Sequence, residues 1–275
     1  MSAEEQWNSF ARVNASQRWR RQSAAMGRAM TEAIVAEAQV GEGMWAIDVA
    51  SGTGEPAISI ASLLKGSGKV VATDISAEPL KIAGQRARER GLVNLECVLA
   101  DVHHLPFPDM QFDRATSRLG VMFFANLPQA LREIRRVLKP GGRASLLAWG
   151  AMDQPYFHCT VGTVLRLLPE LTLPASCMAL FKFGASGTLS QALMEAGFAK
   201  AEERVAEVPW NWPGTPAELW EWFQAVTVPF HPLLQAIPAE RRQEVDAEVI
   251  AALDRRYEGG EVRFQASMVL ASAIR

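Results

Sequence analysis

Residues 46–64, AIDVASGTGEPAISIASLL, join a short apolar segment to a loop of small residues and then to a run whose apolar residues recur at helical spacing. Asp48 stands inside the apolar segment, and a carboxylate buried there is destabilising unless something pairs with it. Gly52 and Gly54, one residue apart, allow the backbone to turn sharply and to approach a ligand closely. The stretch therefore predicts a strand, a ligand-binding turn and a helix.

The same order of strand and helix recurs along the chain as far as residue 150. Apolar strands are expected at 69–76, 93–102, 111–123 and 143–150, and helices at 57–64, 77–91 and 127–138. Strands that alternate with helices in this way predict right-handed crossovers and a parallel sheet covered on both faces.

The segments on either side of this pattern differ from it. Residues before Gly41 and Gly43 are rich in helix formers, whereas the region 151–183 is irregular and rich in proline and aromatic residues. Beyond it we expect a helix at 188–200, a strand at 201–210, a helical Trp-rich segment at 213–260 and a last strand at 262–275. No repeat, linker or low-complexity tract divides the chain, which predicts one domain with two insertions.

The composition limits the classes of function. The 275 residues are 49% hydrophobic and carry a formal net charge of -2, so nothing attracts the whole chain to nucleic acid or to an anionic membrane. Cys97, Cys159 and Cys177 have neither metal-ligand nor disulfide spacing, which predicts a reducing compartment and no metal. A polar N-terminus, and no apolar run approaching about 20 residues, predict a cytoplasmic protein without stable membrane association.

Acidic residues lie at or near the ends of three successive predicted strands. Ligands of an open parallel sheet bind beyond the carboxyl ends of its strands, where Asp48, Asp74 and Asp101 would gather. A dinucleotide fingerprint would place a third glycine where Ala57 stands, and Glu55 follows the loop with no basic residue nearby. This local charge disfavours a pyrophosphate and favours a ligand with a positive centre.

Four segments together resemble a known family. AIDVASGTG (46–54), VVATDIS (70–76), LADVHHLPFPDMQFD (99–113) and EIRRVLKPGGRASLL (133–147) are similar to class I methyltransferases that use S-adenosyl-L-methionine. The match looks like the methyltransferase type 11 branch that includes the ubiquinone/menaquinone C-methyltransferases. It covers roughly residues 43–150, with a weaker similarity in 181–198, and implies S-adenosyl-L-homocysteine as a product.

The resemblance implies a role for each matching position. The glycine loop would hold the methionine part of the cofactor, with Asp48 near its ammonium group, and Asp74 would accept both ribose hydroxyls. Ile75 would pack on the adenine ring, whose amino group would donate to Asp101. The implied cofactor-binding residues are Asp48, Ala50, Ser51, Gly52, Gly54, Asp74, Ile75, Asp101, Val102 and Ser117.

The acids also have a purely structural alternative, because a carboxylate at a strand end can cap the next helix. Asp109 and Asp113, in the turn before the fourth predicted strand, are expected to be structural. The run KPGG at 139–142 is expected to be a turn, since proline stops a helix and glycine supplies positive φ.

The resemblance also implies a fold and a domain organisation. We expect an α/β, Rossmann-like, doubly wound sheet of seven mostly parallel strands with a final antiparallel strand and helical cap insertions. The expected organisation is a single methyltransferase domain, 1–275, made of an N-terminal helical lid at 1–43, a cofactor-binding core at 44–150 and cap insertions at 151–188 and 211–262.

Methyl transfer from a sulfonium is an in-line displacement, so the protein mainly aligns the two reactants and excludes water. A base is needed only if the acceptor must lose a proton, and the candidates are Asp153, Tyr156, His158 and His231, with the last three preferred. A surface or satisfied core position is the alternative for each. His103 and His104 could approach the cofactor or lie on the loop surface.

The acceptor is expected to be a small molecule. Trp210, Trp212, Trp220 and Trp222 predict either the core of a cap or an apolar substrate pocket, and hence an apolar, ring-bearing or isoprenoid acceptor. The quinone branch carries an Arg-Asn pair after a glycine near the fourth strand, but here Gly120 is followed by valine and methionine.

Two other classes of function compete with this one: a nicotinamide-dependent oxidoreductase on a similar sheet, and a non-catalytic protein that keeps the fold. The oxidoreductase would need phosphate contacts at the glycine loop. The N-terminal segment contains Trp7, Phe10 and Trp19, which could form a lid over the cofactor. Packing between helices, including those of a partner chain in a homo-oligomer, is the alternative.

Overall fold

The computed structural model describes residues 14, 15 and 17–275, so Trp7 and Phe10 of the expected lid lie outside the described residues. The chain forms two compact units. The first consists of the described residues up to Ala29, Ala151–Lys182 and Glu207–Ser267, and the second of Met30–Gly150, Phe183–Ala206 and Met268–Arg275. The whole of the predicted core, 44–150, therefore falls in the second unit.

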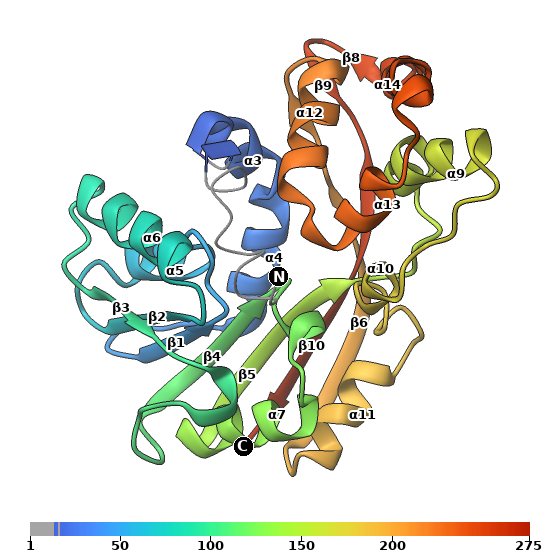
Figure 1. Cartoon of the computed structure of the whole chain (residues 1–275). Helices are drawn as coiled ribbons and strands as arrows, with labels where there is room; N and C mark the ends of the chain where they lie inside the picture. The colour runs from blue at the N-terminus through green and yellow to red at the C-terminus, as the bar shows by residue number, and fades with distance from the viewer. Residues whose placement is uncertain (1–13, 16) are drawn as a thin grey trace. The chain divides into compact units, whose positions relative to one another are not determined.

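A seven-stranded sheet organises the second unit (Figure 1). Its strand order is β3-β2-β1-β4-β5-β10-β6, and β10 pairs antiparallel with β5 while β1 to β5 pair in parallel. The strands are β1 (Trp45–Val49), β2 (Lys69–Asp74), β3 (Leu95–Leu99), β4 (Phe112–Arg118), β5 (Leu138–Trp149), β6 (Ala199–Pro209) and β10 (Gln265–Ile274). The predicted mostly parallel sheet with a final antiparallel strand is confirmed.

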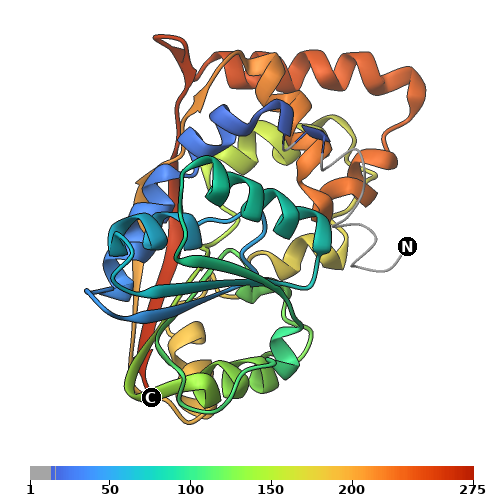
Figure 2. The same cartoon turned by 90° about the vertical axis from the view of Figure 1, so that its left-hand side faces the viewer.

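Helices cover both faces of this sheet. In both views α5 (Ala57–Leu64) and α6 (Ala77–Glu89) lie on one face, and α7 (Leu127–Val137) and α11 (Thr188–Glu195) lie on the other (Figures 1 and 2). Buried apolar side chains of α5 pack against β1 and β2, and Val35 of α4 (Arg28–Ala38) adds to this cluster. Burial of these apolar faces explains why the alternating sequence pattern becomes a covered sheet.

The order of strands places a switch point next to β1. The chain winds from β1 out to β3, then returns to the other side of β1 with β4. Ligands of such sheets bind at this point, outside the carboxyl ends of the strands. Val49, Asp74, Leu99 and Arg118 are the last residues of β1, β2, β3 and β4, so the predicted acids lie at or near these ends.

Two predicted boundaries near β4 and β5 were wrong. The fourth strand ends at Arg118 rather than continuing to residue 123, because Leu119 adopts a φ of 60° and Val121–Phe123 form a 3-10 turn. Residues 139–142 were expected to form a turn before the fifth strand, but they lie inside β5. The pairing of β4 with β5 shifts register there, which accommodates the two glycines.

Short helices and a small sheet make up the first unit. The region 151–183, expected to be irregular, contains α8 (Pro155–Phe157), a π-helix (His158–Gly162), α9 (Thr163–Leu167) and α10 (Ala175–Ala179). Its other helices are α3 (Arg20–Met26), α12 (Pro216–Val226), α13 (His231–Gln235) and α14 (Arg242–Asp254). A three-stranded sheet, β7-β9-β8, is formed by Trp212–Pro213, Glu261–Val262 and Tyr257–Glu258.

Aromatic side chains form the core of the first unit. Phe223 of α12 is fully buried, its ring stacks on Trp220 at a centroid distance of 5.5 Å, and Tyr156 meets it edge-on at 6.0 Å. The helix itself begins with a capping box between Thr215 and Glu218. The four tryptophans of the sequence analysis, which are all buried, belong to this aromatic core.

Over the described part of the chain, no helix is both long enough and apolar enough to span a membrane.

Candidate cofactor site

A tight turn joins β1 to α5. Ala50, Gly52 and Gly54 all have positive φ, at 58°, 53° and 109°. Ser51 fastens the turn to β2, because its backbone N–H donates to the Thr73 carbonyl at 2.9 Å. The turn is therefore held in a left-handed conformation that favours glycine, as the GTG pattern predicts.

Asp48 lies in β1, just before this turn. The side chain is fully buried, and its Oδ1 accepts a hydrogen bond from Thr116 Oγ1 at 2.7 Å. Its Oδ2 has no hydrogen-bond partner among the described residues. Burial raises the pKa of Asp48 to about 7, although Thr116, Ser51, the charge of Arg118 and the nearby backbone N–H of Ala57 lower it. A buried carboxylate oxygen without a donor fits the ammonium group of a ligand, met directly or through water.

Asp74 lies against the same turn. Its Oδ2 accepts from the backbone N–H of Gly52 and its Oδ1 from that of Ser76, both at 2.8 Å. These two bonds fix the carboxylate at the end of β2, beside the glycine loop. The next residue, Ile75, leaves about half of its side chain exposed (49%), which fits an apolar contact with a ring.

Asp101 follows β3 and caps the 3-10 turn Val102–His104. Its Oδ1 accepts from the backbone N–H of His103 at 2.9 Å and lies 2.6 Å from His103 Nδ1. Partial burial raises the pKa of Asp101, but the hydrogen bonds from the backbone and the ring of His103 oppose this effect, and the net pKa is lowered. Asp101 thus caps this turn through Oδ1, which also receives the ring contact of His103.

The end of β4 approaches the glycine loop closely. A Cβ on Gly120 would lie 2.6 Å from the Ala50 Cβ and 2.7 Å from Ser117 Oγ, so only glycine fits. Ser117 is fully buried, and its hydroxyl oxygen has no hydrogen-bond partner in the described chain. Val121 and Met122, at the place of the Arg-Asn pair, are both buried.

Basic residues surround the turn, which corrects the expectation that none lies near it. Arg86 Nη1 donates to the Thr53 carbonyl at 2.5 Å, and Arg118 Nε donates to the Glu55 carbonyl at 3.3 Å. The Glu55 carboxylate lies 3.6 Å from Arg86 and 3.7 Å from Arg90. Arg86 lies in α6, Arg90 follows that helix and Arg118 ends β4, so only the fold brings these arginines to the loop. They pair mainly with Glu55 and loop carbonyls.

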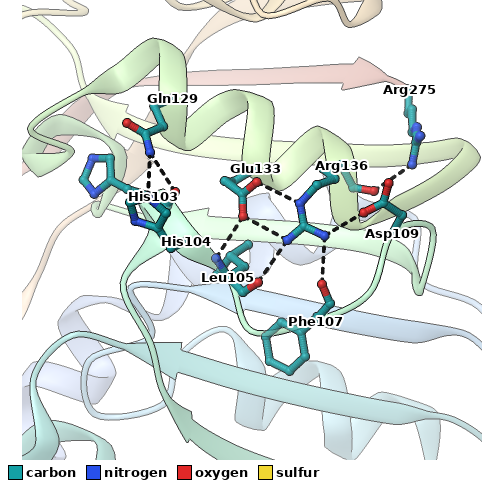
Figure 3. Close-up of polar contacts among 9 residues, drawn as sticks. All are labelled: His103, His104, Leu105, Phe107, Asp109, Gln129, Glu133, Arg136 and Arg275. Atoms are coloured by element: carbon teal, nitrogen blue, oxygen red, sulfur yellow. Dashed lines mark hydrogen bonds and ion pairs between the residues drawn. The ribbon is translucent and has the colours of Figure 1, made fainter.

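A cluster of polar contacts that sequence reasoning missed fastens the loop after Asp101 to α7 (Figure 3). The guanidinium of Arg136 donates to the carbonyls of Leu105 and Phe107 at 2.9 and 2.8 Å. It also pairs with Glu133 at 2.7 Å and Asp109 at 2.8 Å. The side-chain bond from Glu133 is the main cause of a raised pKa for Arg136. The spacing of three between Glu133 and Arg136 on one helix is the signal that could have indicated the pair.

The acids predicted to be structural have structural partners. Asp109 pairs with Arg136, and Asp113 accepts from Lys139 Nζ and from the Trp45 backbone N–H, each at 2.9 Å. Asp113 therefore ties the start of β1 to β5.

The three candidate bases belong to the first unit. Tyr156 is buried among aromatic rings, and burial raises the pKa of its phenol despite a bond with Trp210, which disfavours a role as a base. The ring of His158 is exposed, with Nε2 at 2.6 Å from Asp153 Oδ1. His231 begins α13 and is partly buried.

A sequence model of the ubiE/COQ5 methyltransferase family matches residues 19–172, more than half of the chain. The chain belongs to the ubiE/COQ5 methyltransferase family. This membership confirms the resemblance to class I methyltransferases seen in the four motifs, and nothing in the comparisons supports the oxidoreductase alternative.

Among curated proteins, the chain is 36% identical over 133 residues to the ubiquinone/menaquinone biosynthesis C-methyltransferase UbiE of Bordetella avium (strain 197N). The match covers 48% of this chain and 52% of that protein. The chain thus spans about half the length of the curated ubiE/COQ5 relatives it matches.

Solved structures share the fold at lower identity. A SAM-dependent methyltransferase from Aquifex aeolicus superposes with a TM-score of 0.56 and 20% identity, covering 71% of this chain and 92% of that one. Phosphoethanolamine N-methyltransferase 2 of Haemonchus contortus, in complex with phosphomonomethylethanolamine and S-adenosylhomocysteine, superposes at 0.61 and 15% identity, covering 100% and 61%. These similarities establish the Rossmann-like fold of the ubiE/COQ5 member described here.

Proposed function

We propose that this protein is an S-adenosyl-L-methionine-dependent methyltransferase that moves a methyl group to a small, apolar or ring-bearing acceptor by in-line displacement. The observation that carries the proposal is Asp48, a fully buried carboxylate with one unbonded oxygen under a left-handed glycine turn. Family membership supports the same reaction class.

The carboxyl edge of the sheet offers a group for each part of the cofactor. The glycine turn and Asp48 would hold the methionine part, and Asp74 would accept from the ribose. Ile75, Asp101 and Val102 would bind the adenine. When bound, the cofactor supplies a methyl group on a sulfonium, which is electrophilic without further activation.

The charge of Asp48 couples to the charge of the ligand. A carboxyl whose pKa is about 7 is partly protonated near neutral pH. A nearby ammonium favours the ionised form, so binding would release a proton. Asp48 would in this way discriminate in favour of a ligand whose tail carries a positive charge.

We infer an apolar or ring-bearing acceptor from the apolar residues that follow β4. Val121 and Met122 are buried where the quinone branch has an arginine and an asparagine. The Bordetella avium relative is a ubiquinone/menaquinone biosynthesis C-methyltransferase, and quinone-type acceptors belong to the proposed class of ring-bearing and isoprenoid acceptors.

A base would be required only for acceptors that lose a proton. His158 suits that role better than Tyr156, because its ring is exposed and Asp153 orients it at 2.6 Å. His231 is the second candidate.

We also propose a cytoplasmic location, because three free cysteines without a disulfide are typical of a reducing compartment.

A further proposal is that the protein self-associates through its N-terminal helical segment. Light scattering of the full chain and of a chain beginning at Met30 would test self-association. The full chain should form an oligomer with more subunits than the shortened chain. Equal numbers of subunits would contradict the proposal.

The function is tested by incubating the protein with isotope-labelled S-adenosyl-L-methionine and an extract of host-cell small molecules. Mass spectrometry should find one apolar product that gains the label. Asp74→Ala serves as the inactive control. A protein that binds the donor but labels nothing in any fraction would instead be a non-catalytic binder.

A further inference from the structure

We propose that His103 is a positioning residue that orients Asp101 toward the adenine amino group and so makes the site selective for adenine. The inference rests on the proposed function, since it takes adenosine as half of the cofactor. It is carried by a chain of hydrogen bonds that starts at Asp101, passes through the imidazole ring and ends on the backbone before α7.

The contacts of the ring determine which nitrogen carries the proton. His103 Nε2 accepts from the Asn126 backbone N–H at 3.1 Å, so this nitrogen presents a lone pair. With Nε2 as the acceptor, Nδ1 carries a proton and donates to Asp101 Oδ1 at 2.6 Å. The ring cannot turn without losing contacts at both ends.

The backbone around His103 is held as firmly as its ring. Its carbonyl accepts from Gln129 Nε2 at 3.0 Å (Figure 3), and Asn126 caps α7 by accepting from the Gln129 backbone N–H at 3.2 Å. The His103 side chain is mostly buried (17% exposed), whereas that of Asp101 is 44% exposed. His103 is thus the more buried of the two side chains and fixes the position of the Asp101 carboxylate, which is the more exposed.

This support leaves Asp101 with one committed oxygen. Oδ1 accepts both the backbone N–H and the ring N–H of His103. Oδ2, held in a fixed direction by the first oxygen, is the atom that would accept from a ligand. An exocyclic amino group can donate to it, whereas a carbonyl at the same place would face it with a lone pair.

The neighbouring histidine provides a matched control. His104 follows directly in sequence, its side chain is exposed, and its ring contacts Gln129 Nε2 at 3.2 Å rather than Asp101. A change there removes an imidazole from the same turn without touching the carboxylate.

The experiment is a calorimetric titration of the full chain with S-adenosyl-L-homocysteine and with S-inosyl-L-homocysteine, in which a carbonyl replaces the amino group. The wild-type protein should prefer the adenine compound. His103→Ala should reduce that preference about tenfold, as expected for loss of a hydrogen bond to a charged group. His104→Ala should leave it unchanged.

His103→Asn should restore most of the preference, because its amide N–H can replace Nδ1–H as donor. His103→Leu, which fills the space without donating, serves if the alanine variant does not fold. A fall in affinity that is equal for both compounds would overturn the inference and leave His103 a structural residue. Failure of the wild-type protein to bind either compound would instead contradict the proposed function.

Discussion

Asp48 combines complete burial with a carboxylate oxygen that has no donor among the described residues. Such a group destabilises the protein without ligand and is retained where a ligand needs it. The raised pKa of Asp48 determines how the stability of the protein changes with pH. The folded state holds the proton more tightly than the unfolded chain, so the associated stability is complete below about pH 4 and is lost as the pH rises through about 7.

Asp48→Asn should therefore stabilise the protein in the absence of cofactor and weaken cofactor binding. Asparagine keeps an acceptor for Thr116 and removes the buried charge. At pH 8 the free energy of unfolding should rise by about 1–3 kcal/mol relative to wild type, with little difference at pH 4. Denaturant titrations at the two pH values check this. An asparagine variant that is less stable than wild type at pH 8 would refute the role assigned to the charge.

At the scale of the element, the loop between β3 and β4 depends on α7. Arg136 and Glu133 bond the backbone of Leu105 and Phe107, so the helix sets the course of the segment that carries Asp101. Arg275 extends the cluster, since its guanidinium donates to the carbonyl of Arg136 at 2.8 Å (Figure 3). It also donates to the carbonyl of Leu138.

Arg136→Met should loosen this loop. Amide hydrogen exchange should accelerate over residues 102–111, and the free energy of unfolding should fall by about 1–3 kcal/mol because buried carbonyls lose their donor. Arg132→Met, an exposed position on the same helix, is the matched control and should change neither quantity. Unchanged exchange in the Arg136 variant would show that α7 does not hold the loop.

The order of the elements and the placement of the acids could be predicted, because periodicity and strand ends depend on local sequence. Asp48, Asp74 and the glycine turn lie together as the pattern indicates. The arrangement of Arg86 and Arg118 around the turn could not be predicted, since it depends on how α6 and β4 approach the loop. The end of β4 was also missed, because a φ of 60° at Leu119 has no clear signal in an apolar run.

At the scale of the whole molecule, each of the two units has its own core. The second is a covered sheet of aliphatic residues, and the first is an aromatic cluster around Phe223. The sheet fold hosts many activities, so the proposed function depends on the residues at its carboxyl edge rather than on the fold.

Phe223→Ala should affect the first unit alone. Loss of a fully buried phenylalanine costs about 3–5 kcal/mol. Hydrogen exchange should accelerate over α12 and α14, while β1, β2 and β4 keep their protection. Equal loosening of both units would show that the two cores unfold as one.

The central claim is that the carboxyl edge of the sheet binds S-adenosyl-L-methionine and its product, S-adenosyl-L-homocysteine, through Asp48 of β1 and Asp74 of β2. Calorimetric titration of the wild-type protein with this compound and with NADH tests it most directly, alongside Asp74→Ala and the exposed control Glu78→Ala. The account predicts binding of the adenosyl compound by wild type and Glu78→Ala, a loss of about 1–3 kcal/mol in Asp74→Ala, and no heat from NADH. Tight binding of NADH with no response to the adenosyl compound would contradict it.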